Sequence, residues 1–306
     1  MYSSIHSESS SKARYTFDWN LEGLRGFAAL AVGYSHVFGF NNFLDPSYQP
    51  SAYLKNLWAG HAAVLIFFML SGYLIGLTNT AKFSLQNAKL YLIRRGIRLI
   101  PIYWFAICFS IVVLPTKSLI NILGNLLFLQ NLLVSPLQGN TIIWTLNYEI
   151  VYYLLFLLIW CFKPKLAPLL LGCLIISSIG WLIPQTPQLW SSYAAGWIFW
   201  LIGLGFAWKV QCIQTNSQKI PLFSYLLLLT ATNFFSTGKV FLNSLGFSNP
   251  SAAIVNLSDL ALLPICVLIF AEVTHRQLRY LIMATVNLLC YPVNEYCSLN
   301  AYRSFV

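Results

Sequence analysis

Charged residues are scarce in this chain. They make up 8% of its 306 residues, whereas about a quarter of the residues are charged in soluble domains. Acidic residues are the rarest, because eight Asp and Glu stand against 18 Lys and Arg, and 58% of the chain is hydrophobic. The composition excludes an ordinary soluble domain and predicts an integral membrane protein, with the lipid bilayer as its main partner.

The sequence also lacks the short motifs of several common chemistries. It contains no GxxxxGKS/T phosphate loop, no GxGxxG after a strand, no HExxH and no GxSxG. The seven cysteines are scattered without a CxxC pair, which is typical of small apolar packing residues. The four histidines are dispersed, so no metal site is predicted. No basic helix face with interleaved aromatic residues occurs, which argues against nucleic acid as a partner.

Apolar runs near 20 residues long recur along the chain, and this is about the length that a helix needs to cross the hydrocarbon core. Every backbone polar group must be satisfied inside lipid, and no alternating strand pattern occurs. The fold class predicted is therefore all-α, a polytopic transmembrane helical bundle of about 9–10 spans. The predicted spans are 24–43, 57–77, 99–115, 142–162, 166–183, 193–209, 221–237, 257–273 and 280–293.

Basic residues between the apolar runs orient the chain. They are dense in the segment 78–98, and the polar tail 1–20 carries Lys12 and Arg14. The positive-inside rule places both segments in the cytosol, and the late start of the first apolar run argues against a cleaved signal peptide. We expect a cytosolic N-terminus in a bacterial inner membrane, with 21–293 as the membrane domain and 294–306 as a short C-terminal tail.

The segment 119–134 is short and ambiguous. If it stays on one side of the membrane, the later basic pairs fall on the cytosolic side, and if it crosses, all of them move outside. The positive-inside rule therefore favours a re-entrant or interfacial segment. The later pairs are Lys163 with Lys165, Lys209 with Lys219, and Arg276 with Arg279.

Ionisable side chains inside apolar spans cost free energy and are candidates for function. In the first span Arg25 and His36 are eleven residues apart. They share one helix face and lie about 16 Å apart along the axis. The second run of interest is 67–76, where Gly72 beside Ser71 permits either close helix packing or the approach of a ligand.

The third run, 91–104, stacks guanidinium groups on a helix. Arg95 and Arg98, like Arg94 and Arg98, are about one turn apart. Planar guanidinium groups at this place predict either an anchor at the lipid phosphates or a fork for the phosphate groups of a ligand.

The fourth run, 142–156, places Glu149 well inside a span, with Tyr152 and Tyr153 following on its face. A buried carboxylate is either neutral or paired with Arg or His. An ion pair with one of the arginines is the structural alternative to a role in chemistry. His61, near the outer end of its span, is expected at the membrane interface.

These four runs, in this order, resemble the acyltransferase-3 family of integral membrane O-acyltransferases. The motifs are LEGLRG with the R-x10-H spacing of Arg25 and His36, FFMLSGYLIG, the R-x-x-R of Arg95 and Arg98, and W-x4-E from Trp144 to Glu149. The resemblance implies acyl-CoA, first of all acetyl-CoA, as the donor. It implies a hydroxyl group of a carbohydrate or lipid-linked glycan as the acceptor.

The resemblance also implies roles for single residues. His36 matches the catalytic histidine and would act as general base. Glu149 matches the acidic residue after the tryptophan and would orient the imidazole or stabilise its charge. The expected acyl-CoA contacts are Arg25, Arg94, Arg95, Arg98, Ser71, Gly72 and Tyr73. The expected supporting residues are Trp144, Tyr152, Tyr153 and Glu22, which stands where the family more often has Asp.

Two other interpretations compete with an acyltransferase. A polytopic transporter or flippase also carries ionisable residues inside its spans, but no internal repeat or matched pair of broken spans occurs here. A non-catalytic scaffold would need neither His36 nor the arginines. The range 281–306 departs from the further helix, histidine and span with which family members usually continue. This departure predicts a truncated or frameshifted tail, poor insertion of 280–293 and, as an alternative, an inactive remnant.

Overall fold

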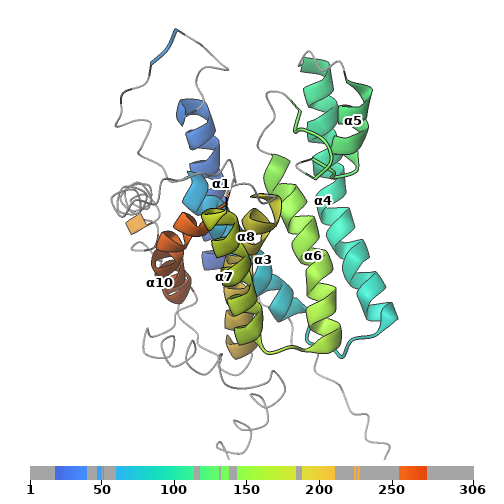
Figure 1. Ribbon diagram of the computed structural model, residues 1–306, viewed down its shortest axis with the longest axis vertical. Helices are drawn as coiled ribbons and strands as arrows, with labels where there is room; N and C mark the ends of the chain where they lie inside the picture. The colour runs from blue at the N-terminus through green and yellow to red at the C-terminus, as the bar shows by residue number, and fades with distance from the viewer. Residues whose placement is uncertain are drawn as a thin grey trace, which may run out of the picture.

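A bundle of α-helices forms the described part of the chain (Figure 1). The computed structural model describes residues 18–39, 47–49, 51, 60–113, 118–130, 132–137, 143–183, 188–210, 224, 226–227 and 255–273. Within these residues every regular element is helical, which confirms the all-α prediction. The elements are α1 (Trp19–Gly39), α3 (Gly60–Thr78), α4 (Leu85–Val113), α5 (Leu119–Leu126), α6 (Trp144–Phe162), α7 (Leu166–Leu182), α8 (Gln188–Val210), the 3-10 helix η3 (Leu257–Leu262) and α10 (Leu263–Val273).

Four of these helices, α3, α4, α6 and α8, are long and apolar enough to cross a membrane. The apolar helix α7 is shorter, and α1 reaches 21 residues although it carries two charged side chains near its start. Each predicted span between 24 and 209 therefore has a helix at its place. Most of the predicted span 221–237, the span 280–293, most of the N-terminal tail and the C-terminal tail lie outside the described residues. The predicted span 257–273 is divided between the 3-10 helix η3, of six residues, and α10, of 11 residues, and neither is among the helices long enough to cross a membrane. The total number of spans stays a prediction.

Helix α4 begins at Leu85, well before the predicted start of its span at 99. Its first half carries Lys89 and the arginines, so hydropathy detects only the apolar second half. Pro101 lies inside the helix, where it removes one backbone hydrogen bond. Large apolar side chains such as Ile97, Phe105 and Val112 are exposed on its surface, which is the pattern of a helix that faces lipid.

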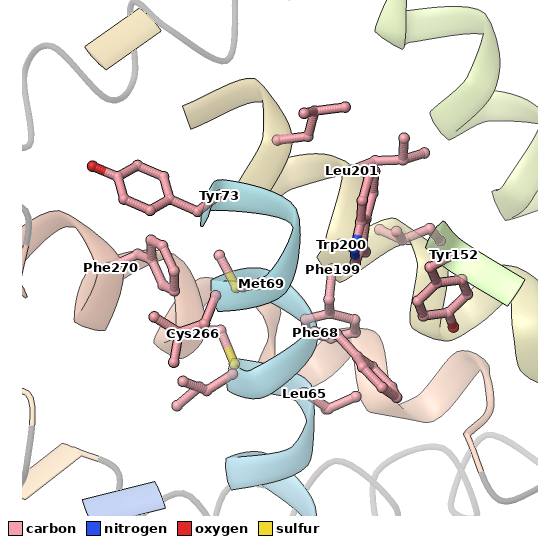
Figure 2. Packing of buried hydrophobic residues seen from close by; sticks show 14 of the residues in the cluster. Leu65, Phe68, Met69, Tyr73, Tyr152, Phe199, Trp200, Leu201, Cys266 and Phe270 are labelled. Carbon is pink, nitrogen blue, oxygen red and sulfur yellow. The ribbon is translucent and has the colours of Figure 1, made fainter. Parts of the chain in front are cut away.

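Helix α3 lies at the centre of the bundle and packs most closely against α8. A Cβ atom at Gly72 would overlap the backbone carbonyl of Trp200, and one at Gly203 would overlap that of Met69. Small residues on both helices thus allow the backbones to touch, as is common in membrane bundles. Figure 2 shows this core, with Phe270 on one side of α3 and Trp200 on the other.

The connections bring the basic segments to one end of the bundle. Helices α1 and α3 run in opposite directions, as do α4 and α6, so the start of α1 and the connections 79–84 and 163–165 share the lower end in Figure 1. Lys82 lies in the first of these connections, and Lys163 and Lys165 lie in the second. This arrangement agrees with the predicted grouping of basic residues on one side of a membrane.

Within the described residues of the ambiguous segment 119–134 the one helix is α5, whose eight residues span about 12 Å. The amide of Asn125 donates to the backbone carbonyl of Ser135 at 2.9 Å, so the chain folds back beside α5. Tyr103 of α4 donates to the carbonyl of Asn125 at 2.5 Å, which fixes α5 against α4. A helix of this length cannot cross the hydrocarbon core, and the structure agrees with a segment that stays on one side.

Candidate functional site

A cavity of about 800 Å³ lies between α1, α3, α4 and α6. Most of its lining is apolar, as in pockets that take small molecules. The ionisable residues of the lining come from all four helices and are Arg25, His36, His61, Arg95, Arg98 and Glu149. Residues that were predicted from separate motifs thus meet in one space.

The order of residues along the helices gives the cavity two different ends. Arg25 lies in the second turn of α1 and His36 near the end of that helix, so their predicted shared face is the one that lines the cavity. His61 lies in the first turn of α3, which runs in the opposite direction to α1. The two imidazoles therefore lie toward one end of the cavity, and Arg25 lies toward the end that carries the basic connections.

Arg95 is held by aromatic rings. Its guanidinium carbon lies 5.6 Å from the ring centres of both Tyr91 and Tyr153, which is within the range of cation–π attraction. Its Nη2 also donates to the hydroxyl oxygen of Thr78 at 3.4 Å. These contacts fix the guanidinium group at the cavity wall.

The other arginines are arranged differently. Nη1 of Arg25 donates to both carboxylate oxygens of Glu22, at 2.8 and 2.9 Å. Arg98 is exposed on α4 and also lines the cavity. Arg94 is exposed too, but it does not line the cavity. Of the four arginines predicted to meet phosphate, Arg25, Arg95 and Arg98 line the cavity.

Glu149 lies among these cations. Its Oε2 accepts a hydrogen bond of 3.2 Å from the hydroxyl of Tyr153, and Arg98, Arg95 and Arg25 all act on it electrostatically. The predicted role of Glu149 toward the His36 imidazole stays a prediction.

Four further site residues were predicted around these groups. Ser71 and Trp144 line the cavity, and Trp144 packs edge to face against Tyr148 with ring centres 5.1 Å apart. Gly72 does not, because it contacts the backbone of α8, and Tyr73 packs against Phe270 at 5.6 Å instead. The predicted cofactor contacts at Gly72 and Tyr73 are replaced by helix packing.

The two adjacent tyrosines of α6, Tyr152 and Tyr153, have different surroundings. Tyr153 lines the cavity, whereas the hydroxyl of Tyr152 donates to the backbone carbonyl of Tyr193 at 3.0 Å inside the core. Tyr152 therefore supports the contact between α6 and α8.

Sequence reasoning missed one buried acid near the cavity. Nε2 of His61 lies 3.0 Å from Oδ2 of Asp259, whose side chain is fully buried. Asp259 belongs to η3, and its Oδ2 also accepts the backbone N–H of Asn256 at 2.9 Å. The signal for this site is an isolated Asp in an apolar run, three residues after an Asn that can form a capping box with it.

Fold and cavity together define a class of protein, a helical integral membrane protein whose cavity combines guanidinium groups with imidazoles. The family model of the acyltransferase domain matches residues 18–293. The chain belongs to the acyltransferase-3 family and is a membrane acyltransferase. No curated protein and no solved structure matches the chain.

Proposed function

We propose that the protein moves an acyl group, in the first place acetyl, from acyl-CoA to a hydroxyl group of a surface carbohydrate or a lipid-linked glycan. One observation carries the proposal: a single cavity holds Arg25, Arg95 and Arg98 together with His36. The guanidinium groups suit a polyanionic donor, and the imidazole suits removal of a proton from a hydroxyl group.

The donor binds at the end that carries the arginines. CoA is polyanionic and stays out of hydrocarbon, and guanidinium forks bind phosphate oxygens in pairs. This end of the bundle also carries Lys82, Lys163 and Lys165, and the positive-inside rule makes it cytosolic. The N-terminus then lies in the cytosol, and the protein resides in a bacterial inner membrane.

The acceptor enters from the opposite end and meets His36. A ring nitrogen of His36 takes the proton of the acceptor hydroxyl group, and the hydroxyl oxygen attacks the carbonyl carbon of the thioester. The bond between carbon and sulfur breaks, and the CoA thiolate leaves with the proton that His36 took, so the imidazole returns to its neutral form. The ring of Tyr153 holds Arg95 beside the donor during this step, and the hydroxyl of Tyr153 donates to Glu149.

The test is acyl transfer by the full chain in membrane vesicles. Radiolabelled acetyl-CoA is supplied with and without surface polysaccharide, and the acetyl content of the polysaccharide is measured by mass spectrometry in cells with and without the gene. We expect release of CoA only when acceptor is present, and loss of acetyl mass from one polymer when the gene is deleted. Solute uptake without any acyl transfer would contradict the proposal and identify a carrier.

A further inference from the structure

The end of the cavity opposite to the arginines contains a second imidazole beside His36. Ser35 and Gly60 are in tight contact, since a Cβ atom on Gly60 would overlap the hydroxyl of Ser35. His36 and His61 are the next residues on the two helices, and both line the cavity. The close approach of α1 and α3 therefore brings the two imidazoles to the same level.

A buried carboxylate, that of Asp259, lies 3.0 Å from Nε2 of His61. Asp259 has 0% exposed surface and does not line the cavity, whereas the side chain of His61 is 29% exposed. Burial of an unpaired carboxylate costs free energy that an adjacent imidazole offsets. A carboxylate behind an imidazole also holds the ring and stabilises it when it gains a proton, as in catalytic triads.

Asp259 itself is held firmly. Its backbone and side chain form a capping box with Asn256 at the start of η3. The preceding residue, Val255, donates its N–H to the hydroxyl of Ser192 in α8 at 3.0 Å, and this hydroxyl also contacts that of Tyr148 in α6 at 2.5 Å. The carboxylate is thus anchored to two other helices, which gives His61 a fixed support.

The lining at this end suits a neutral hydroxylated molecule. Besides the imidazoles it includes Ser35, Thr145 and Trp144. The hydroxyl of Ser35 donates to the backbone carbonyl of Val32 at 2.8 Å and keeps its capacity to accept a hydrogen bond. Hydroxyl and imidazole groups exchange hydrogen bonds with other hydroxyl groups, whereas the cations that attract phosphate belong to the other end of the cavity.

On the basis of the proposed acyl transfer, we infer that His61 binds a hydroxyl group of the acceptor and that Asp259 is a positioning residue for His61. The acceptor class is a neutral carbohydrate, and the pair sets how tightly it is held beside His36. Asp259 acts through His61 and makes no contact with either substrate.

The experiment measures the KM for acceptor and the KM for acetyl-CoA separately. It uses the full chain in liposomes, with the surface polysaccharide that loses acetyl mass on gene deletion as the acceptor. We expect His61→Gln to raise the KM for polysaccharide about tenfold, which corresponds to about 1.4 kcal/mol, and to leave the KM for acetyl-CoA unchanged. Asp259→Asn should raise the same KM about threefold, because it keeps an oxygen for the capping box and loses the charge.

The control is Ser177→Ala, a buried polar residue of α7 that bonds Ser191 away from the cavity; it should change neither KM. If His61→Gln leaves the KM for polysaccharide unchanged, or lowers only kcat, the inference is wrong. If His61→Gln fails to accumulate, Asp259→Asn decides alone. If these variants lower the thermal stability and raise the KM for acetyl-CoA as well as that for polysaccharide, the pair of His61 and Asp259 only stabilises the fold, and the inference is wrong. Failure of the wild-type protein to transfer acetyl would instead refute the proposed function.

Discussion

The two sides of α3 have different surroundings and different roles. One side is packed against α8 so tightly that Gly72 and Gly203 each touch backbone of the partner helix. The other side faces a cavity of about 800 Å³ and presents His61 and Ser71 to it. A single helix thus provides both the rigid centre of the bundle and one wall of the site. The comparison predicts that substitutions on the first side affect stability, whereas those on the cavity side affect activity.

The largest effect is expected at the cavity. His36→Ala removes the general base, and loss of such a group lowers the rate about 10² to 10⁴-fold. Because His36 is only half-buried, the variant should accumulate and fold like the wild-type protein. The transfer rate is measured in vesicles, and the amount of accumulated protein is measured by immunoblot. The control is Val37→Ala, an exposed neighbour, which should keep full activity. Normal transfer by folded His36→Ala would refute the assignment of His36.

A substitution on the packed side should act on stability. Gly72→Ala places a Cβ atom against the carbonyl of Trp200, and overpacking of this kind costs about 1–3 kcal/mol. The thermal midpoint of the detergent-solubilised protein should fall, while the molecules that remain folded keep their KM for acetyl-CoA. Gly172→Ala is the matched control, because nothing lies within 4 Å of its added Cβ. Equal midpoints for the two variants would contradict the packing role of Gly72.

The contrast between the two sides also shows what sequence reasoning can predict. Arg25 with His36, the arginine pair and Glu149 could be found because polar groups in apolar runs are costly, and helical spacing shows which of them share a face. The structure brings them into one cavity. Ser71 and Gly72 could not be separated, because adjacent residues point about 100° apart and only the partner helix decides which one meets the cavity.

The pair of His61 and Asp259 could not be predicted for a different reason. The two residues lie at opposite ends of the membrane domain in sequence, so their contact depends on how α3 and η3 pack in the bundle. Hydropathy predicted the apolar part of α4, and the start of the helix at Leu85 lies in its more polar first half. The resemblance named the correct family, whereas the contacts of Glu149 with Tyr153 and its proximity to the arginines required coordinates.

A smaller effect is expected when the arginines are changed conservatively. Arg95→Lys keeps the positive charge but loses the planar fork that stacks between Tyr91 and Tyr153. We expect the KM for acetyl-CoA to rise about tenfold, which is about 1.4 kcal/mol, with little change in the KM for acceptor. Arg98→Lys should raise the KM for acetyl-CoA less, because the two cation–π contacts belong to Arg95. The control is Lys89→Ala, an exposed residue of the same helix. An unchanged KM for acetyl-CoA in both arginine variants would place the donor elsewhere.

The smallest effect is expected at two adjacent tyrosines of α6, where one substitution should change activity and the other stability. Tyr153→Phe keeps the ring beside Arg95 and removes the hydrogen bond to Glu149, so it should cost about 1 kcal/mol, or about fivefold in kcat/KM for acetyl-CoA. Tyr152→Phe removes a bond of similar length to the carbonyl of Tyr193 in the core and should lower the thermal midpoint instead. The two variants delete the same atom at neighbouring positions, so composition and helix propensity are matched. If both lose activity equally while stability is unchanged, the division between a packed side and a cavity side does not extend to α6.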